Sequence, residues 1–183
     1  MTGEWLSPDL SVPVTPPLTS GSACRSPELL RAVVAQFELD AHPRYRARDL
    51  TGDGHPETFC NVALAELTAA LGCLVPRILQ VGLELRWARA NDQVRWLRRA
   101  GAHGWVRCTS DEAQSAAERG HVAVVGWENP AGPGHVALVV PSDGAPGVWI
   151  AQAGATNFSR GRLESGFGQL PVEFFLHHEG VTQ

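Results

Sequence analysis

Cys60 stands at the start of an apolar run with helical spacing, and His135 opens an apolar run much further along the chain. A thiol near a helix N-terminus is acidified by the helix dipole, so it is more readily present as a thiolate. A histidine beside such a thiol can take its proton, which leaves a nucleophile able to attack a carbonyl carbon. The two residues predict nucleophilic cysteine chemistry, with Cys60 as the nucleophile and His135 as the base.

The choice of histidine is not settled by the local sequence, because the chain has seven histidines. Gly120-His121-Val122-Ala123 nearly repeats Gly134-His135-Val136-Ala137. His135 is favoured because residues 129–134, rich in proline and glycine, form a loop that can hold a strand-leading side chain at the edge of a cleft. His121 and the absence of any catalytic histidine stay open as alternatives.

A third polar group is expected to hold the imidazole by bonding to its second nitrogen. Gln152 lies among apolar neighbours in the run 148–152 and shares a face of that predicted strand with Val148 and Ile150. Asn157 is the second candidate for this role. Asn61, which follows the nucleophile, and Asn157 are also the predicted substrate-binding side chains.

The four cysteines are Cys24, Cys60, Cys73 and Cys108, and none forms a CxxC pair. The spacing is therefore unlike that of a zinc or redox site, and mostly free thiols are expected in a reducing compartment. Cys73 and Cys108 are interpreted as small buried hydrophobic residues.

One segment before Cys60 resembles the opening of a calcium loop. Asp49, Thr51 and Asp53 supply oxygen atoms at alternate positions, and Gly54 stands sixth. The twelfth position is Cys60 instead of the usual bidentate glutamate. A partial calcium site and a simple Asx-type turn both remain possible, and no cofactor is expected to be required.

Composition limits the class of protein further. With 183 residues and 44% hydrophobic content, the chain can bury one sizeable core, predicted for residues 26–183 behind a Pro/Ser/Thr-rich leader at 1–25. A net charge of -4 argues against a nucleic-acid partner. Because lysine is absent, lysine Schiff-base and P-loop chemistry are excluded.

Targeting features are also missing from the sequence. No run approaches the roughly 20 apolar residues that a membrane span needs. Residues 1–5 lack the basic start of a signal peptide, so synthesis in the cytoplasm without a signal is expected. A monomer is expected.

Hydrophobic periodicity and capping residues predict helices first and strands afterwards. A helix is expected over 26–38 after the cap Ser26, a loop over 40–57, and a central helix over 58–71 with Thr58 or His55 as its cap. Short helices are expected near 91–97 and after Thr109 or Ser110. Strands are expected over 121–127, 135–141, 148–153 and 172–176, which indicates an α+β fold with a mostly antiparallel sheet.

This order, with Cys60 on a helix and His135 and Gln152 on successive strands, resembles the papain-like fold of NlpC-type peptidases and CHAP amidases. Thr58-Phe59-Cys60-Asn61 and Gly134-His135-Val136-Ala137 carry the likeness, together with Arg44-Tyr45, Trp127-Glu128-Asn129-Pro130 and residues 150–158. The resemblance covers about residues 28–178. Some CHAP enzymes also carry a calcium loop just before the nucleophile, where Asp49 to Asp53 stand here.

The resemblance implies a cysteine hydrolase that cleaves an amide bond in peptidoglycan, as an amidase or an endopeptidase. Without a signal peptide, such an enzyme would reach the cell wall by lysis or through a secretion machine, with an immunity or delivery partner. Two alternatives remain, because papain-like folds serve several functions. They are a toxin that deamidates or cleaves a protein, and a noncatalytic wall-binding module.

Overall fold

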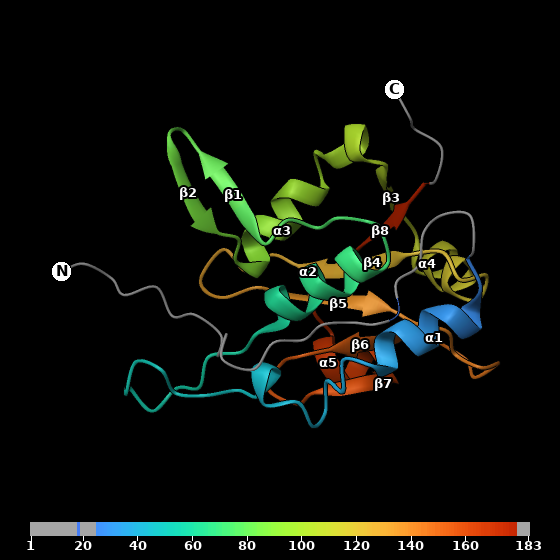
Figure 1. Ribbon diagram of the computed structural model, residues 1–183, viewed down its shortest axis with the longest axis horizontal. Helices are drawn as coiled ribbons and strands as arrows, with labels where there is room; N and C mark the ends of the chain where they lie inside the picture. Colours follow the sequence, from blue (N-terminus) through green and yellow to red (C-terminus); the bar gives the residue numbers. More distant parts are fainter. Residues whose placement is uncertain (1–17, 19–24, 179–183) are drawn as a thin grey trace.

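A six-stranded antiparallel sheet forms the centre of the fold in the computed structural model (Figure 1), which describes Leu18 and residues 25–178. Cys24 and most of the predicted leader therefore lie outside the described residues. The strand order is β3-β8-β4-β5-β6-β7, so the last strand is inserted between β3 and β4. The strands are β3 (Trp105–Cys108), β4 (Ala123–Trp127), β5 (His135–Val139), β6 (Trp149–Gln152), β7 (Phe158–Arg162) and β8 (Glu173–His177).

The first helix, α1 (Pro27–Ala35), starts where the sequence predicts. The Ser26 hydroxyl accepts a hydrogen bond from the Leu29 N–H at 3.1 Å, and Pro27 occupies the first helical position. The helix ends three residues before the predicted end at Glu38. Glu38 itself has a positive φ of 46°, which a right-handed helix cannot contain.

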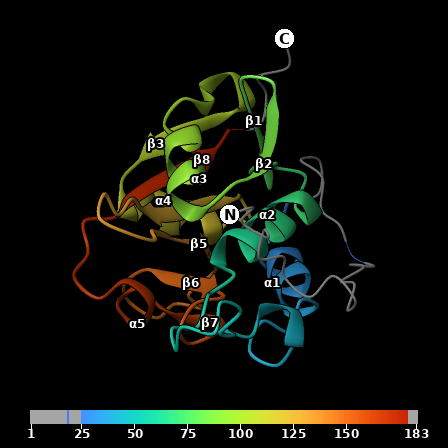
Figure 2. The same ribbon diagram turned by 90° about the vertical axis from the view of Figure 1, so that its left-hand side faces the viewer.

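The central helix, α2 (Cys60–Ala70), begins at the predicted nucleophile, Cys60. Its N-cap is Phe59, which makes no side-chain capping bond, so the prediction of Thr58 or His55 as the cap is wrong. Gly72, with φ 68°, follows the helix end as predicted. The helix packs against β5 and beside α1, and Figure 2 shows both helices on one side of the sheet. Cys60 is thereby fixed at the start of a buried element.

The remaining helices are short. Predicted helices near 91–97 and after Thr109 are present as α3 (Ala90–Leu97) and α4 (Ser110–Ala117), and Thr109 caps α4 with Glu112. The structure adds elements that the sequence did not indicate. These are the 3₁₀ helices η2 (Pro43–Tyr45) and η3 (Ala100–His103), the helix α5 (Leu163–Phe167), and the strands β3 and β7.

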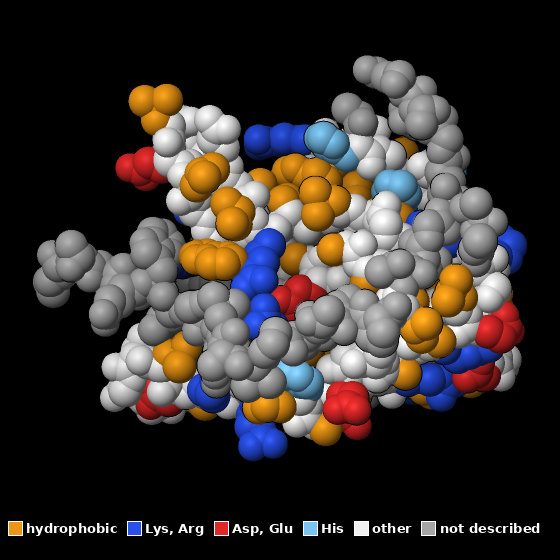
Figure 3. All heavy atoms as spheres, viewed as in Figure 1, with side chains coloured by type: hydrophobic (Ala, Val, Ile, Leu, Met, Phe, Trp, Pro, Cys, Tyr) orange, Lys and Arg blue, Asp and Glu red, His pale blue; other side chains and the backbone are white. Residues whose placement is uncertain are grey.

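A second sheet of two strands, β1 (Ile78–Val81) and β2 (Glu84–Trp87), projects from the body as a hairpin. It was also missed in the sequence. Its apolar side chains gather at the upper left of Figure 3, where Leu83 is fully exposed and Leu85 is 74% exposed. Figure 2 shows this hairpin and the loop of residues 46–57 on either side of α2.

Two coarse predictions can be judged from the fold. The protein is a mixed α+β structure with antiparallel sheets, as expected. Among the described residues, no helix has both the length and the apolar character needed to cross a bilayer.

Candidate active site

The Cys60 thiol lies in the first turn of α2 and is only 4% exposed. The His135 imidazole and the backbone N–H groups of Val136 and Asn61 lie near enough to the sulfur to lower the pKa of the thiol. Residues 75 positions apart in the sequence therefore meet where the start of α2 lies against the start of β5. The predicted nucleophile and the predicted base are brought together.

Gln152 holds the other side of the imidazole. Leu138 lies opposite Ala151 in the β5–β6 pair, so the start of β5 lies beside the end of β6. His135 Nε2 is therefore within hydrogen-bond distance of Gln152 Oε1, at 2.7 Å. The orientation of the amide follows from its second bond, in which Gln152 Nε2 donates to the Thr156 carbonyl at 2.9 Å. The oxygen therefore faces the histidine, which must donate from Nε2. Nδ1 is left as the ring nitrogen for the thiol.

The charges of this pair support a thiolate. Burial raises the pKa of Cys60. His135 and the N–H groups of Val136 and Asn61 lower this pKa by more than burial raises it, so the net pKa lies below that of an ordinary thiol. Burial lowers the pKa of His135, while the sulfur and Gln152 raise it above its ordinary value overall. Both shifts favour a thiolate–imidazolium pair.

A short helix, α5, closes the back of the site and was not predicted. The Phe167 ring lies 4.6 Å from the imidazole, measured between ring centroids, and is 2% exposed. Its neighbour Gly166 leaves room for Gln152, because a Cβ there would stand 2.2 Å from Gln152 Oε1. Gly154 similarly leaves room for the imidazole, with a Cβ 3.1 Å from His135 Cε1. A five-residue helix that contains glycine has no helical sequence signal.

The loop before His135 is held by Asn91, at the start of α3. Its amide donates to the carbonyls of Asn129 and Gly132 and accepts from the Asn129 N–H at 2.9 Å. A Cβ on Gly134 would stand 2.1 Å from Asn91 Oδ1, so only glycine permits this approach. The sequence identified the loop but did not identify the side chain that fixes it.

His121 lies far from this group because of strand direction. β4 and β5 are antiparallel, with Trp127 opposite His135 and Ala123 opposite Val139. His121 therefore precedes β4 at the end of the pair where β5 finishes. There its N–H bonds to the Ala116 carbonyl at the end of α4.

The two predicted substrate-binding asparagines bond to the backbone. Asn61 donates to the Ala88 carbonyl at 2.8 Å. Asn157 accepts from the Gly154 N–H at 2.9 Å and donates to the Tyr45 carbonyl at 2.8 Å. Both lie beside the group formed by Cys60, His135 and Gln152, where they connect segments that surround it. Gln152, and not Asn157, is the side chain that meets the histidine.

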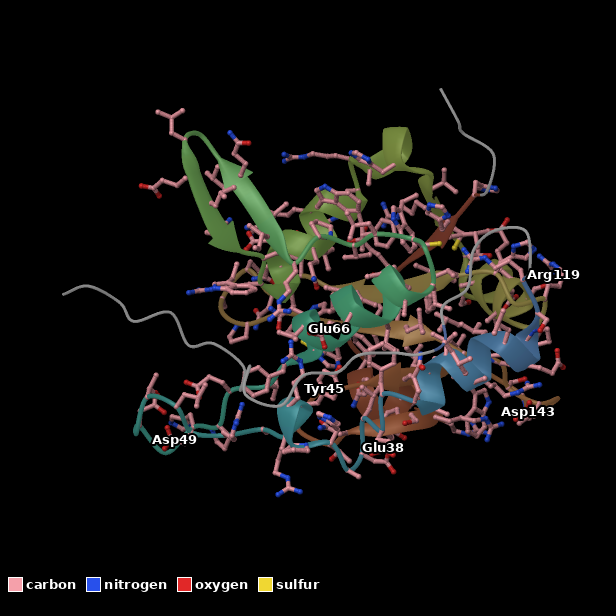
Figure 4. All side chains as sticks on the ribbon, in the orientation of Figure 1. Glu38, Tyr45, Asp49, Glu66, Arg119 and Asp143 are labelled. Carbon is pink, nitrogen blue, oxygen red and sulfur yellow. The ribbon has the colours of Figure 1, made fainter. Side chains whose placement is uncertain are left out.

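The Asp49 carboxylate forms the Asx-type turn that was left open in the sequence. It accepts N–H groups from Gly52, Asp53 and Gly54 at 2.6, 3.2 and 2.8 Å. Asp49 lies on an outlying loop, well away from Tyr45 and Glu66 in Figure 4. Within residues 25–178, no group of three His, Cys, Asp or Glu side chains is arranged to hold a metal ion, and calcium at this loop remains a prediction.

The other described cysteines lack the surroundings of Cys60. Cys73 is buried, and its sulfur accepts a hydrogen bond from the Arg25 guanidinium at 2.9 Å. Burial, with Glu112 nearby, raises the pKa of Cys108 to about 11. Cys108 therefore stays protonated at neutral pH.

Comparison with known proteins adds no identity: no protein-family model matches the chain, and no curated protein sequence matches it significantly.

Proposed function

We propose that the protein is a papain-like cysteine hydrolase that cleaves an amide bond in peptidoglycan, as an amidase or endopeptidase. The observation that carries the proposal is the chain of contacts from Cys60 through His135 to Gln152, with the thiol at a helix start and Gln152 Oε1 2.7 Å from His135 Nε2. Nucleophile, base and orienting group are the three parts that acyl transfer by a cysteine requires. Peptidoglycan is the substrate implied by the resemblance to NlpC-type and CHAP enzymes.

The reaction begins when the Cys60 sulfur attacks the amide carbonyl carbon. His135 holds the thiol proton at Nδ1 and delivers it to the leaving amine nitrogen, so the C–N bond breaks and a thioester forms. Water then attacks the thioester with His135 as base. The acid is released and the thiol is restored. Gln152 keeps the imidazole in the tautomer and orientation that both proton transfers need.

The negative charge that develops on the substrate carbonyl oxygen in the transition state needs a hydrogen-bond donor to stabilise it. The backbone N–H of Cys60 is at the first position of α2, where helical N–H groups have no acceptor within the helix. Such groups point toward an anion and are favoured by the helix dipole. We assign the Cys60 N–H as one oxyanion donor.

The test is digestion of purified sacculi with wild type, Cys60→Ala and Cys60→Ser, followed by mass spectrometry of the released fragments. The wild type should release muropeptides with a newly exposed amine and carboxylate, which identify the scissile bond. Both variants should release none, and their circular dichroism should match that of wild type.

Unchanged sacculi after treatment with a folded wild-type protein would reject the wall-cleaving proposal. If Cys60 then still reacted rapidly with iodoacetamide at neutral pH, the alternative of an enzyme acting on a protein would be favoured. A slow reaction would favour the noncatalytic binding module. The delivery route and its partner remain part of the proposal, because they depend on the wall as substrate.

A further inference from the structure

The turn between β6 and β7 carries the group that orients Gln152. Residues 153–157 connect Gln152, the last residue of β6, to Phe158, which lies opposite Gln152 in the β6–β7 pair. Within this turn the Thr156 carbonyl accepts from Gln152 Nε2 at 2.9 Å, which leaves Oε1 facing His135. Gln152 is buried, but Thr156 is exposed. The orientation of a buried amide therefore depends on an exposed stretch of backbone, which needs support from other residues.

Asn157 supports this turn from within. Its side-chain oxygen Oδ1 accepts from the Gly154 N–H at 2.9 Å, which closes the turn between these two residues. Gly154 also packs against the site, because a Cβ there would stand 3.1 Å from His135 Cε1 and 3.4 Å from Gln152 Nε2. A shift of the Gly154 backbone would therefore disturb both the imidazole and the amide.

The other end of the Asn157 amide is bonded outside the turn. Its Nδ2 donates to the carbonyl of Tyr45 at 2.8 Å. Tyr45 is buried, and its hydroxyl donates to Glu66 Oε2 at 2.6 Å (Figure 4). Arg44 Nε donates to both oxygens of Glu66, at 3.0 and 3.1 Å. Because Glu66 lies on α2, the residue that anchors Asn157 is attached to the helix that begins at Cys60.

These contacts form a closed ring around the site. The ring starts and ends on α2, and it passes through Glu66, Tyr45, Asn157, Gln152, His135 and Cys60. The sheet by itself holds this end of β6 less regularly, since the register of the β6–β7 pair shifts between Ile150 and Gln152. The ring therefore sets the position of the turn relative to Cys60.

The orientation of the Gln152 amide decides which nitrogen of His135 carries the proton. With Oε1 toward the ring, Nε2 donates to it, and Nδ1 is left to take the thiol proton. If the amide turned over, its NH₂ group would face Nε2, and the ring proton would have to move to Nδ1. A neutral ring protonated at Nδ1 cannot take a proton there. The Thr156 carbonyl distinguishes the two orientations, because it accepts only from the nitrogen end of the amide.

We propose that Asn157 is a positioning residue, which holds the β6–β7 turn so that Gln152 presents its oxygen to His135. This inference rests on the proposed hydrolase function. Asn157 acts through Gln152, so its loss should slow the chemical step and leave substrate binding almost unchanged. A side chain that binds substrate would instead show its loss mainly in KM.

The kinetic test compares Asn157→Ala with Thr68→Val. Each variant removes an oxygen that accepts a backbone N–H, from Gly154 at 2.9 Å in the first and from Val75 at 3.2 Å in the second. Thr68 lies near the end of α2, away from Cys60. Asn157→Ala should lower kcat for muropeptide cleavage by roughly 10- to 50-fold and change KM less than about twofold. Thr68→Val should lower the thermal midpoint and keep the kcat of wild type. Wild-type kcat in folded Asn157→Ala, or a loss confined to KM, would overturn the inference.

A double-mutant cycle with Gln152→Glu tests the route through the amide. A carboxylate has two equivalent oxygens, so it accepts from His135 Nε2 whichever way it is turned. In the Gln152→Glu background, Asn157→Ala should therefore change kcat less than about threefold. A loss as large as that in the wild-type background would show that Asn157 does not act through the orientation of Gln152.

A measurement of the His135 tautomer separates this inference from the proposed function, because it involves no turnover. Cys60→Ala is prepared with histidine labelled for nitrogen NMR, and the His135 signals are those that a further His135→Ala change removes. At about pH 9, where an ordinary histidine is neutral, Cys60→Ala should show a single tautomer protonated at Nε2. Adding Asn157→Ala should give a mixture with the Nδ1 tautomer, and this result supports the inference even if sacculi are not cleaved. A single Nε2 tautomer in both proteins would overturn it and leave the hydrolase proposal standing.

Discussion

Residues 120–125 and 134–139 have nearly the same sequence but different surroundings. Gly120 has φ +81° at the end of α4, and a Cβ there would stand 2.3 Å from the Ser26 backbone carbon. Gly134 instead makes room for the Asn91 side chain. His121 follows the first glycine at a helix end, while His135 follows the second beside Cys60. The two histidines differ in their tertiary neighbours, so local sequence is not sufficient to identify the base that the proposed reaction needs.

Exchanging the two histidines for alanine tests this difference most severely. His135→Ala should lower the rate of muropeptide cleavage by about 10²- to 10⁴-fold, because it removes the proposed general base. His121→Ala should change it less than about twofold, since within residues 25–178 His121 forms a hydrogen bond only through its backbone N–H. Cleavage rates of the two purified variants provide the measurement. A loss in His121→Ala equal to that in His135→Ala would contradict the assignment.

Gln152→Ala should have the next largest effect. Without the amide oxygen, the imidazole loses the bond that fixes its tautomer, and a loss of roughly 10- to 100-fold in kcat is expected. The pH dependence of kcat distinguishes orientation from simple damage to the fold. The variant should titrate with a lower histidine pKa, because Gln152 contributes to raising that pKa. An unchanged profile with unchanged kcat would remove Gln152 from the catalytic group.

Gly166→Ala tests the packing of α5 against Gln152. A methyl group 2.2 Å from Gln152 Oε1 has to displace the amide, so we expect a roughly tenfold loss of activity in a protein that still folds. Thermal unfolding by circular dichroism provides the control. Full activity would mean that α5 moves freely away from Gln152.

Gly120→Ala should act on stability. A residue with a Cβ at φ +81° costs at least about 1–2 kcal/mol, and contact with the Ser26 backbone adds to this. Denaturant unfolding should therefore show a lower midpoint, while the activity of the folded fraction stays normal. If activity falls and the midpoint does not, residues 120–125 influence the site around His135 more than the contacts indicate.

Ser26→Ala is expected to have the smallest effect. It removes the cap of α1, which bonds to the Leu29 N–H, and should cost about 1 kcal/mol of unfolding free energy. The midpoint of urea denaturation measures this change. A loss of unfolding free energy equal to that in Gly120→Ala would mean that the Ser26 hydroxyl, and not the close approach of the Gly120 and Ser26 backbones, determines how stable the contact between these two residues is.

Local signals in the sequence predicted the elements with strong caps or strong periodicity. Ser26-Pro27 identified the start of α1, and Thr109 with Glu112 identified α4. The start of α2 was misplaced because Phe59, an apolar N-cap, gives no capping signal. The β1–β2 hairpin was missed because apolar residues occupy both of its faces, so its sequence lacks the alternation of apolar and polar residues that predicts a strand. In the structure its burial does not alternate either, and the exposed residues include Ile78, Val81 and Leu85.

The nucleophile and base of the candidate site could be predicted from the sequence, but the residues that position them could not. Cys60 and His135 could be proposed because a thiol before an apolar run and a histidine at a strand start have recognisable positions. The contact between His135 and Gln152 depends on the register of β5 and β6, which places Leu138 opposite Ala151. Phe167 and Asn91 act through long-range contacts, which no short stretch of sequence can encode.

The central claim is that His135 makes Cys60 acidic, and the pH profile of Cys60 alkylation tests it directly. Reaction with iodoacetamide, followed by peptide mass spectrometry at Cys60, gives the rate at each pH, with Cys108 as an internal reference whose pKa is about 11. In wild type the rate should titrate below the ordinary thiol pKa. In His135→Ala only burial and the backbone donors remain, so the titration should move to higher pH and the rate at pH 7 should fall, while His121→Ala should match wild type. An identical titration in wild type and His135→Ala would contradict the account.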